Sequence, residues 1–387
     1  MADASEAGCP VCGAQVMETV HDSKTGTSLS SLCQILPGAK IVRFCNACGH
    51  LAGNGVADAQ SFYETDYRIL IEDEDEDQIY ETRDDRIVTR TDHQMALVLD
   101  KVTLEPGSHV LDYGCAKAAM ARKLLDARPD LKMHLFDVSQ MYENFWDRLV
   151  AKDRQAVHRT PEAWDGQFDL ITSFFAFEHI DDPAGAMAHV ARLLKSGGHL
   201  HMIVPDVFGN AADFIVIDHV NHFTRPSLIR LLADAGLGEA EIDQTSYRGA
   251  LVVTARKTGV TSSEATDTGD ISSIGERARA LSAFWTAAAV AINSSEEERD
   301  TAAIYGSGFY GAFIYAHLQR PGAVAGFIDR SPWLQGKKLF GVPILAPEAL
   351  PEGVNIVYAG LNPAIAPGII EAQPWFGRDG LRIVYLQ

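Results

Sequence analysis

The pattern of apolar and polar residues in the middle of the chain alternates between two periods. Residues 109–137, HVLDYGCAKAAMARKLLDARPDLKMHLFD, have the order of an apolar strand, a glycine turn, an amphipathic helix and a second apolar strand. The segment 167–183 predicts another strand with a polar end, 184–206 a helix, a Gly-Gly turn and a strand, and 224–237 a helix that ends near a glycine. Strands that alternate with helices predict an α/β fold with a largely parallel sheet covered on both faces.

The C-terminal third contains a second, shorter series of the same kind. Residues 257–275, KTGVTSSEATDTGDISSIG, are rich in Ser, Thr, Gly and Asp, and this composition predicts a linker. Beyond it, 276–292 repeats apolar residues at helical spacing, and a strand at 301–305 leads into a glycine-rich turn and a helix. We therefore expect a smaller Rossmann-like α/β domain over 276–387.

The composition adds constraints on compartment and partners. The 387 residues carry a formal net charge of −19, with 47% hydrophobic and 22% charged residues, as in an ordinary folded chain. No apolar run approaches the roughly 20 residues that cross a bilayer, and the first residues, MADASEAG, lack the basic and apolar parts of a signal peptide. We expect a cytoplasmic monomer with no membrane or nucleic-acid partner, since phosphate backbones are bound mainly by clustered Lys and Arg.

Four of the six cysteines form two C-x-x-C pairs. They are Cys9 and Cys12 in CPVCG, and Cys45 and Cys48 in CNACG. Two such pairs can place four thiolates around one zinc ion, and the glycine after each second cysteine allows the backbone to turn its amides toward the sulfurs. Four ligands leave no open position, so we expect a zinc ribbon with a structural metal over residues 1–65. A redox dithiol or unrelated buried thiols are the alternatives.

Candidate chemistry in the core begins where its first strand ends, at DYG. This strand end resembles motif I of the class I S-adenosylmethionine (SAM)-dependent methyltransferases, in which an acidic residue and a glycine turn hold the methionine part of the cofactor. We expect this core over residues 66–256. The resemblance implies five cofactor-binding residues, namely Asp112, Gly114 and Ala116 at the turn, Asp137 for the ribose hydroxyls, and Phe174 on the strand beside the transferable methyl group.

The glycine turn departs from the G-C-G-x-G pattern of that class. Here it reads GCAKA, with Ala116 and Ala118 in place of two glycines. Alanine is the smallest replacement, so close approach of a cofactor is compatible with it. A positive φ at either alanine would cost roughly 1–2 kcal/mol.

The C-terminal domain carries its own glycine motif. Gly306, Gly308 and Gly311 form G-x-G-x-x-G between a strand and a helix, and Asp329 ends the next strand. Taken alone, this arrangement predicts a dinucleotide such as NAD. A helix N-terminus binds other phosphates through the same backbone amides, so a different nucleotide diphosphate also satisfies the motif.

A four-cysteine ribbon, a methyltransferase core and a Rossmann-like domain, in this order, resemble one family closely. It is that of the three-domain C-methyltransferases that act on nucleotide-linked keto-deoxysugars. The resemblance rests on CPVCG, CNACGHL, FYETDYRI, AFEHIDDP, YGSGFYG and FIDRSPWLQGKKLFGVPILAPEAL. It implies that the C-terminal domain helps hold the sugar nucleotide, with four substrate-binding residues, Gly306, Gly308, Gly311 and Asp329.

Methylation of a carbon atom requires a carbanion. One forms beside a ketone when a base removes the α-proton and the enolate oxygen is stabilised, and a histidine suits this task near neutral pH. The family has its catalytic residues in the segment that reads FIVIDHVNHFTRPSL here. The resemblance implies five candidates, namely His219 as base, Asp218 beside it to hold its ring, His222, His179 and Tyr67.

Other functions remain open alternatives to this SAM-dependent C-methyltransferase. The family has a tyrosine a few residues before His219, where this chain has Val216 and Ile217. Sugar O-methylation, which needs no enolate stabiliser, is therefore one alternative, and a non-catalytic protein that binds only sugar nucleotides is another. A zinc-ribbon rRNA methyltransferase would share the first two domains, but the charge of −19 and the glycine-rich third domain argue against it.

Overall fold

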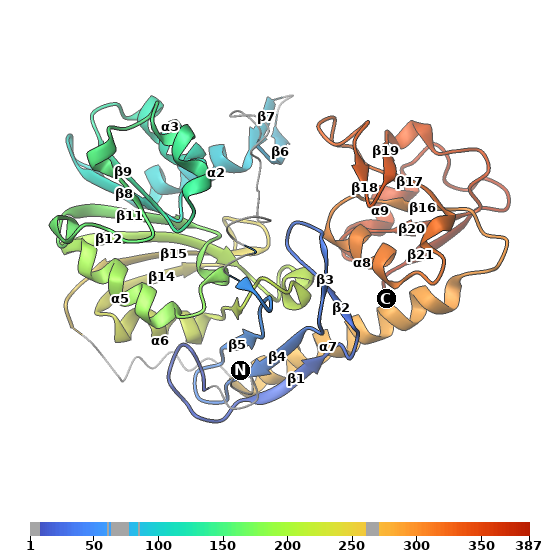
Figure 1. Ribbon diagram of the computed structural model, residues 1–387, viewed down its shortest axis with the longest axis horizontal. Helices are drawn as coiled ribbons and strands as arrows, with labels where there is room; N and C mark the ends of the chain where they lie inside the picture. Colours follow the sequence, from blue (N-terminus) through green and yellow to red (C-terminus); the bar gives the residue numbers. More distant parts are fainter. Residues whose placement is uncertain (1–7, 60–61, 63–76, 84–85, 261–270) are drawn as a thin grey trace. The chain divides into compact units, whose positions relative to one another are not determined.

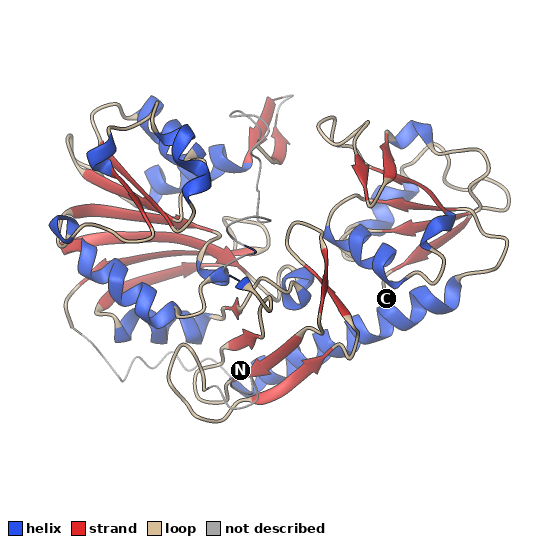
Figure 2. Cartoon of the chain, viewed as in Figure 1, coloured by secondary structure: helices blue, strands red, loops and turns tan. Residues whose placement is uncertain are grey.

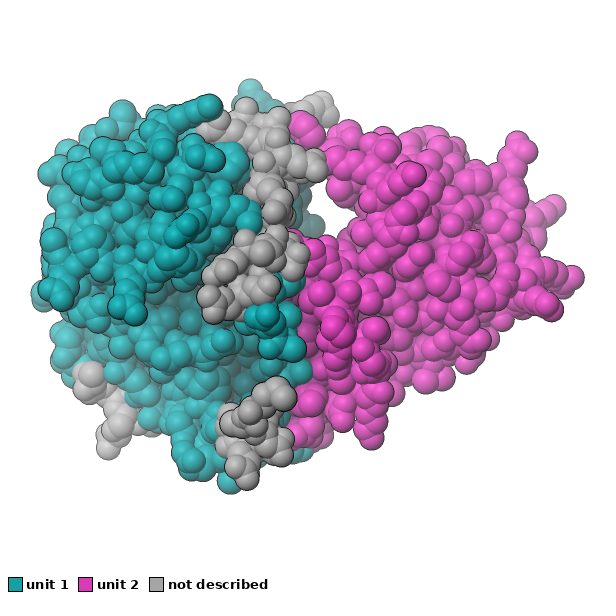
Figure 3. Space-filling view, viewed as in Figure 1, with its two compact units in different colours: residues 1–18, 43–209, 220–274 teal, residues 19–42, 210–219, 275–387 magenta. Residues whose placement is uncertain are grey.

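The computed structural model describes residues 8–59, 62, 77–83, 86–260 and 271–387. The chain divides into two compact units (Figure 3). The first consists of residues 1–18, 43–209 and 220–274, and the second consists of 19–42, 210–219 and 275–387. Each unit is therefore assembled from segments that are separated in sequence, a grouping that differs from the linear series of domains expected from the sequence. No helix in the described ranges is long and apolar enough to cross a membrane.

The core of the first unit is a seven-stranded sheet with the order β10-β9-β8-β11-β12-β15-β14 (Figures 1 and 2). Its pairs are parallel except those of β15, which runs antiparallel to β12 and β14. The predicted α/β fold with a largely parallel sheet is thus confirmed. The strands are β8 (His109–Tyr113), β9 (Lys132–Asp137), β10 (Gln155–Val157), β11 (Phe168–Phe174), β12 (Leu194–Pro205), β14 (Leu237–Asp243) and β15 (Ala250–Lys257).

Helices that cover this sheet are α2 (Arg90–Lys101), α3 (Ala119–Ala127), α5 (Pro183–Leu193) and α6 (Arg225–Asp234), and the short α4 (Glu143–Trp146) packs beside α2 and α3 through Trp146. Successive residues of a strand point to opposite faces. Accordingly, Leu111 and Ile171 lie in a buried cluster with α5 and α6, whereas their neighbours Val110 and Leu170 lie in a second cluster with α2 and α3. Figure 1 shows the two helix pairs on opposite sides of the sheet. The doubly covered sheet explains why its strands are apolar at almost every position.

The direction of the strand order reverses at β8, which lies between β9 and β11. In open parallel sheets, ligands bind at the carboxyl ends of the strands beside such a reversal. The turn after β8 and the loops after β9 and β11 all leave the sheet at this edge, because the three strands are parallel. The fold therefore positions the predicted cofactor residues at one end of the sheet.

The cysteine pairs adjoin a small sheet with the order β1-β4-β5-β13. Strand β13 comes from the end of the core and pairs antiparallel with β5, so that Asn221 faces Ala52 and His222 faces Leu51. The ribbon is thus joined to the core by main-chain hydrogen bonds. The strands are β1 (Glu18–Asp22), β4 (Ile41–Phe44), β5 (Leu51–Gly53) and β13 (Asn221–His222), and a separate hairpin consists of β6 (Ile79–Arg83) and β7 (Arg86–Thr89).

The second unit contains a six-stranded sheet with the order β18-β19-β17-β16-β20-β21. Helix α7 (Ile271–Ser295) begins inside the segment for which the sequence predicts a linker, and residues 261–270 lie outside the described ranges. A hairpin of β2 (Thr27–Leu29) and β3 (Ile35–Pro37) also belongs to this unit. Its other elements are β16 (Ala302–Tyr305), α8 (Phe309–His317), β17 (Val324–Ile328), β18 (Lys338–Leu339), β19 (Val342–Leu345), β20 (Ile356–Ala359), α9 (Ala366–Glu371) and β21 (Arg382–Tyr385).

Candidate active site and metal centre

The turn after β8 is tied to the neighbouring strand β9 by its backbone. The N–H groups of Gly114 and Cys115 both donate to the carbonyl of Phe136, at 2.8 and 3.1 Å. Gly114 has a φ of 76°, and a Cβ built on it would lie 2.7 Å from the Cβ of Ala176. Both the conformation and the close approach require glycine at this position. The predicted glycine turn therefore forms at the carboxyl end of β8, the edge of the sheet at which the cofactor is expected.

The two alanines of this turn have left-handed backbone conformations. The φ angle is 45° at Ala116 and 59° at Ala118, which costs a residue with a side chain roughly 1–2 kcal/mol. Phe175, just beyond β11 at the same edge of the sheet, also has a positive φ, of 53°. The indole N–H of Trp146 donates to the carbonyl of Ala116 at 2.7 Å and helps hold the turn. Backbone strain of this kind clusters at ligand sites.

The Asp137 carboxyl group, at the end of β9, faces the same turn. One of its oxygens accepts the N–H of Ala116 at 2.8 Å, and the other accepts the N–H of Ser139 at 2.9 Å. Its side chain is buried, and this burial raises its pKa. The two oxygens of a carboxylate offer about four acceptor sites, so this group can also accept a hydroxyl. Asp137 can therefore hold the turn and a ribose at the same time.

Asp112 and Phe174 lie at the ends of the adjacent strands β8 and β11. The Asp112 carboxyl group accepts the hydroxyl of Thr172 at 3.0 Å and is only 3% exposed. Burial raises the pKa of Asp112 to about 7. The Phe174 side chain is half-buried and contacts the same apolar cluster as α2 and α3. Asp112 thus ties β8 to β11, while its predicted contact with the cofactor stays a prediction.

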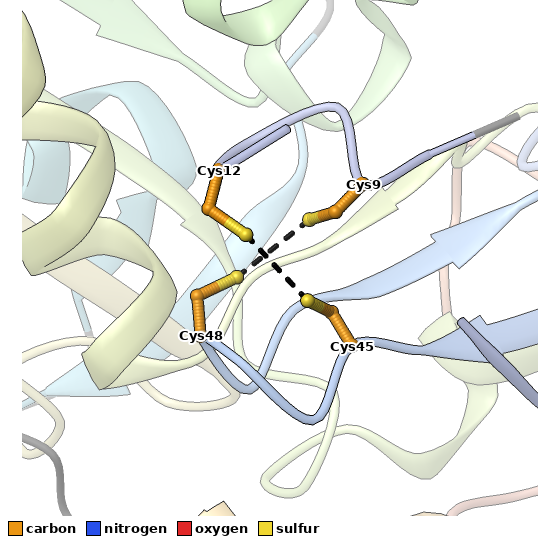
Figure 4. A group of neighbouring side chains, drawn as sticks. All are labelled: Cys9, Cys12, Cys45 and Cys48. Atoms are coloured by element: carbon orange, nitrogen blue, oxygen red, sulfur yellow. Dashed lines mark hydrogen bonds between the residues drawn. The ribbon is translucent and has the colours of Figure 1, made fainter. Parts of the chain in front are cut away.

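The four cysteines of the two C-x-x-C pairs converge, as Figure 4 shows. Their sulfur atoms all lie within 4.8 Å of one another, and the Sγ–Sγ distance is 3.6 Å both for Cys9 and Cys48 and for Cys12 and Cys45. Sulfurs around a tetrahedral zinc with Zn–S bonds of about 2.3 Å would be about 3.8 Å apart. The geometry therefore fits one zinc ion, and the four-cysteine cluster is compatible with the predicted ribbon.

Glycines shape both turns of this cluster. Gly13 and Gly49, which follow the second cysteine of each pair, have φ angles of 73° and 75°. Their N–H groups donate to the carbonyls of Cys9 and Cys45, at 2.9 and 2.8 Å. Each glycine thus closes a tight turn around its cysteine pair, whereas the expected direction of the backbone amides toward the sulfurs stays a prediction.

The cluster is part of the core rather than a separate module. Cys9, Cys45 and Cys48 are buried in the same apolar cluster as α5 and α6. Asn221 adds a polar connection, because its amide group donates to the carbonyls of Phe177 and Ile180, at 3.0 and 2.7 Å, and its oxygen lies 3.2 Å from His50 Nε2. The sequence analysis missed Asn221, since nothing in HVNHF distinguishes it from a loop residue.

The structure leaves the predicted catalytic roles of three residues, His222, His179 and Tyr67, untested. His222 is fully buried in β13, opposite Leu51, which favours a packing role. His179 is half-buried at the end of a short 3₁₀ turn, Phe177–His179, where its N–H donates to the carbonyl of Ala176 at 3.0 Å. Tyr67 lies outside the described residues. Their catalytic roles stay predictions.

His219 and Asp218 lie in the second unit, and their side chains have different partners. The His219 Nδ1 atom is 2.5 Å from a carboxylate oxygen of Asp213. The Asp218 carboxylate instead accepts both the N–H and the hydroxyl of Ser31, each at 2.7 Å. The expected contact between Asp218 and the His219 ring stays a prediction, because the hydrogen bonds of Asp218 described above go to Ser31. Asp213 contacts the ring, and no motif in the sequence indicated it.

The three glycines of the C-terminal motif differ in their surroundings. A Cβ on Gly306 would lie 2.2 Å from the carbonyl oxygen of Gly360, and one on Gly311 would lie 2.0 Å from that of Gly306. A Cβ on Gly308 would meet nothing within 4 Å, and the φ of this residue is an ordinary −90°. Packing therefore requires glycine at 306 and 311, whereas at 308 the turn simply leaves open space at the start of α8.

Asp329 supports this C-terminal turn. One of its carboxylate oxygens accepts the N–H and the hydroxyl of Ser307, at 2.9 and 2.7 Å, and the other accepts the N–H of Ser331 at 2.9 Å. The residue thus holds the glycine turn against the loop after β17. Its predicted contact with substrate stays a prediction.

Known sequences similar to this chain include methyltransferases, in agreement with the fold of the first unit. Residues 87–238, which include the core sheet from β8 to β12, match the family described as "Methyltransferase domain". An O-methyltransferase of ubiquinone biosynthesis from Aromatoleum aromaticum is 27% identical over 169 residues, which are 36% of this chain and 68% of that protein. The same enzyme from Sodalis glossinidius is 31% identical over 24% of this chain and 40% of its own length. A malonyl-[acyl-carrier protein] O-methyltransferase from Alcanivorax borkumensis is 30% identical, over 36% and 51%.

Solved structures give weaker similarity. A SAM-dependent methyltransferase from Mesorhizobium loti has a TM-score of 0.35 at 15% identity and covers 42% of this chain and 97% of its own. A geranyl diphosphate C-methyltransferase from Streptomyces coelicolor A3(2) has the same score at 14% identity, with 42% and 75% covered. Similarity at this level says nothing of substrate.

The class of the protein follows from the family match and the fold together. The chain contains a SAM-dependent methyltransferase domain, and the predicted enzyme class is confirmed. The matched segment excludes both cysteine pairs and the whole C-terminal sheet. The acceptor of the methyl group is therefore a separate question.

Proposed function

We propose that the protein transfers a methyl group from SAM to a carbon atom of a nucleotide-linked keto sugar. The observation that carries this proposal is the open space at Gly308, at the N-terminus of α8, beside two glycines that packing requires. Backbone amides at such a turn suit a diphosphate. The methyltransferase sheet has its own site for SAM, so a second phosphate-binding turn favours an acceptor that carries a nucleotide.

Carbon methylation assigns roles to particular residues. We propose that His219 removes the proton α to the ketone and that the enolate carbon attacks the methyl group of SAM, whose C–S bond breaks to release S-adenosylhomocysteine. The segment that contains His219 follows β12 in the chain, and the carboxyl end of β12 lies at the cofactor edge of the sheet. We propose further that Asp137 binds the ribose of SAM. The four cysteines would hold a zinc ion that stabilises the fold and leaves no position for substrate.

O-methylation of a sugar is the second candidate. Two observations favour it: Val216 and Ile217 stand where the resembling family has a tyrosine, and the three relatives described above are named O-methyltransferases. A hydroxyl acceptor would need a base but no enolate. The position of the new methyl group in the product separates the two candidates.

The test is product analysis with SAM carrying a ¹³C-labelled methyl group. The purified protein is incubated with dTDP-, GDP- and CDP-linked keto sugars, and NMR locates the label. We expect one of these compounds to gain a carbon-bound methyl group. A label bound to oxygen would establish the second candidate instead, and the absence of methylation across the panel would refute the assignment to sugar nucleotides.

A matched pair of variants tests the role of the C-terminal turn. Gly308→Phe should raise the KM for the sugar nucleotide and leave the affinity for SAM unchanged. Gly322→Phe is the control, because a Cβ at Gly322 also meets nothing within 4 Å and its φ is not positive. Equal effects of the two substitutions, or extraction of tightly bound NAD from the purified protein, would overturn the diphosphate assignment.

A further inference from the structure

Asp213 and His219 form a buried pair inside the second unit. The His219 Nδ1 atom and the Asp213 carboxylate oxygen are 2.5 Å apart, and the two side chains are 12% and 1% exposed. A carboxylate in this position accepts the Nδ1–H of the ring, which leaves the lone pair of the neutral imidazole on Nε2. The pair therefore has the geometry in which a carboxylate fixes the orientation and the tautomer of a histidine.

The position of Asp213 is fixed by the turn on which it lies. Residues Ala211–Ile215 form a 3₁₀ turn, in which the N–H of Val216 donates to the carbonyl of Asp213 at 3.2 Å. The indole N–H of Trp285, from α7, donates to the carbonyl of Ala211 at 3.0 Å. Because Trp285 is only 2% exposed, this turn is held by a side chain that itself has little freedom.

Lys40 fixes the main chain from Val216 to His219. Its ammonium group donates to the carbonyls of Val216 and His219, at 2.7 and 2.9 Å, and the residue is 2% exposed. Burial lowers the pKa of Lys40 to about 7, against the opposing attraction of the Asp213 and Asp218 carboxylates. The main-chain N–H of Ile217 also donates to the carbonyl of Leu29, at 2.8 Å. Residues 216–219 are thus held from several directions.

The carboxylate next to the ring favours a protonated His219. The Asp213 oxygen lies 2.5 Å from the Nδ1 atom of His219, and an opposite charge at such a distance stabilises the imidazolium. Asp218 is bound to Ser31 through both oxygens, whereas Asp213 is in direct contact with the ring.

We infer that Asp213 is the positioning residue for His219 in the methyl transfer: it holds the ring through Nδ1 and stabilises the imidazolium that forms when Nε2 takes up the substrate proton. Lys40 serves the same pair by binding the main-chain carbonyls of Val216 and His219. This inference rests on the proposed function, in which His219 is the base. The same arrangement of carboxylate and imidazole supports proton removal in the hydrolases with catalytic triads.

The test uses histidine NMR on the full-length zinc-loaded protein, without substrate. Nitrogen shifts distinguish the two neutral tautomers, and the His219 signal is the one of the 13 histidines that disappears in His219→Gln. We expect the parent protein to have its proton on Nδ1 and Asp213→Asn to shift the tautomer, since an amide can donate to the ring. Asp22→Asn, which removes an exposed carboxylate from the same unit, should leave the signal unchanged.

Turnover provides the second measurement. With the substrate found by product analysis, Asp213→Asn should lower kcat by about 10²- to 10⁴-fold with little change in KM or in thermal stability. A parent protein with the proton on Nε2 would refute the inference even if Asp213→Asn failed to fold. If His219→Gln abolishes turnover but Asp213→Asn changes neither tautomer nor kcat, only the role of Asp213 is wrong. If His219→Gln retains normal turnover, the proposed base is wrong and the positioning role with it.

Discussion

The strained alanines of the cofactor turn allow a quantitative prediction about stability. Ala116 and Ala118 have φ angles of 45° and 59°, in a region where glycine has no steric cost. Replacing either one by glycine should therefore relieve strain while keeping the course of the chain. We expect Ala116→Gly to stabilise the protein, although Ala→Gly substitutions in ordinary positions destabilise.

The expected size follows from three contributions. Relief of the left-handed conformation contributes roughly 1–2 kcal/mol, and the greater freedom of glycine in the unfolded chain subtracts about 0.4–1 kcal/mol. Loss of a fully buried methyl group subtracts about 0.8 kcal/mol more. Ala118 is 0% exposed, so this loss applies to it in full, whereas Ala116 is only half-buried. We expect a gain of about 0.5 kcal/mol for Ala116→Gly and a change near zero for Ala118→Gly.

The assay is urea-induced unfolding of the zinc-loaded protein, with the slope of the transition checked for each variant. Ala121→Gly is the control, since Ala121 is fully buried in α3 and should lose about 2 kcal/mol through helix propensity and its methyl group. If Ala116→Gly destabilised the protein as Ala121→Gly does, the assigned strain would not exist. Unchanged SAM affinity would show that the turn keeps its shape.

Three further predictions concern the metal, the cofactor and a buried lysine. Elemental analysis should find one zinc ion per chain. Cys45→Ser should lose both the zinc and stability, whereas Cys33→Ser should retain both. Full stability of Cys45→Ser would contradict a structural role of the metal. Asp137→Ala should weaken SAM binding by about 1.5–3 kcal/mol in calorimetry, whereas Asp130→Ala should not; unchanged affinity would move the ribose elsewhere. The pKa of Lys40 is about 7 in the folded protein and 10.5 in its ordinary state. Between pH 7 and pH 10.5, Lys40 is therefore protonated in the unfolded chain but largely neutral in the folded one. The free energy of unfolding consequently rises with pH in this range. The free energy of unfolding of the parent, relative to Lys40→Met, should therefore increase from pH 7 to pH 10, and a constant difference would refute this.

Much of the fold could be predicted from local patterns. The apolar run that ends in DYG, the helix after it and the next strand appear as β8, α3 and β9, because chain periodicity determines which residues a strand or a helix buries. Spacing within CPVCG and CNACG likewise determined each pair of thiols, since two residues between cysteines suffice for both to contact one metal.

Only the tertiary structure decided which residues from distant parts of the sequence contact one another. Periodicity identifies a buried face but not its partner, so the Asp213 carboxylate could not be distinguished from its neighbour Asp218 as the partner of His219. The same holds for glycines: packing against Gly360 requires Gly306, whereas open space surrounds Gly308, although both belong to one motif. Whether the alanines of GCAKA would be strained depended on the path of the backbone, which is held by Trp146 and Asp137 from other parts of the chain. Contacts between distant segments determine such features, and no local pattern encodes them.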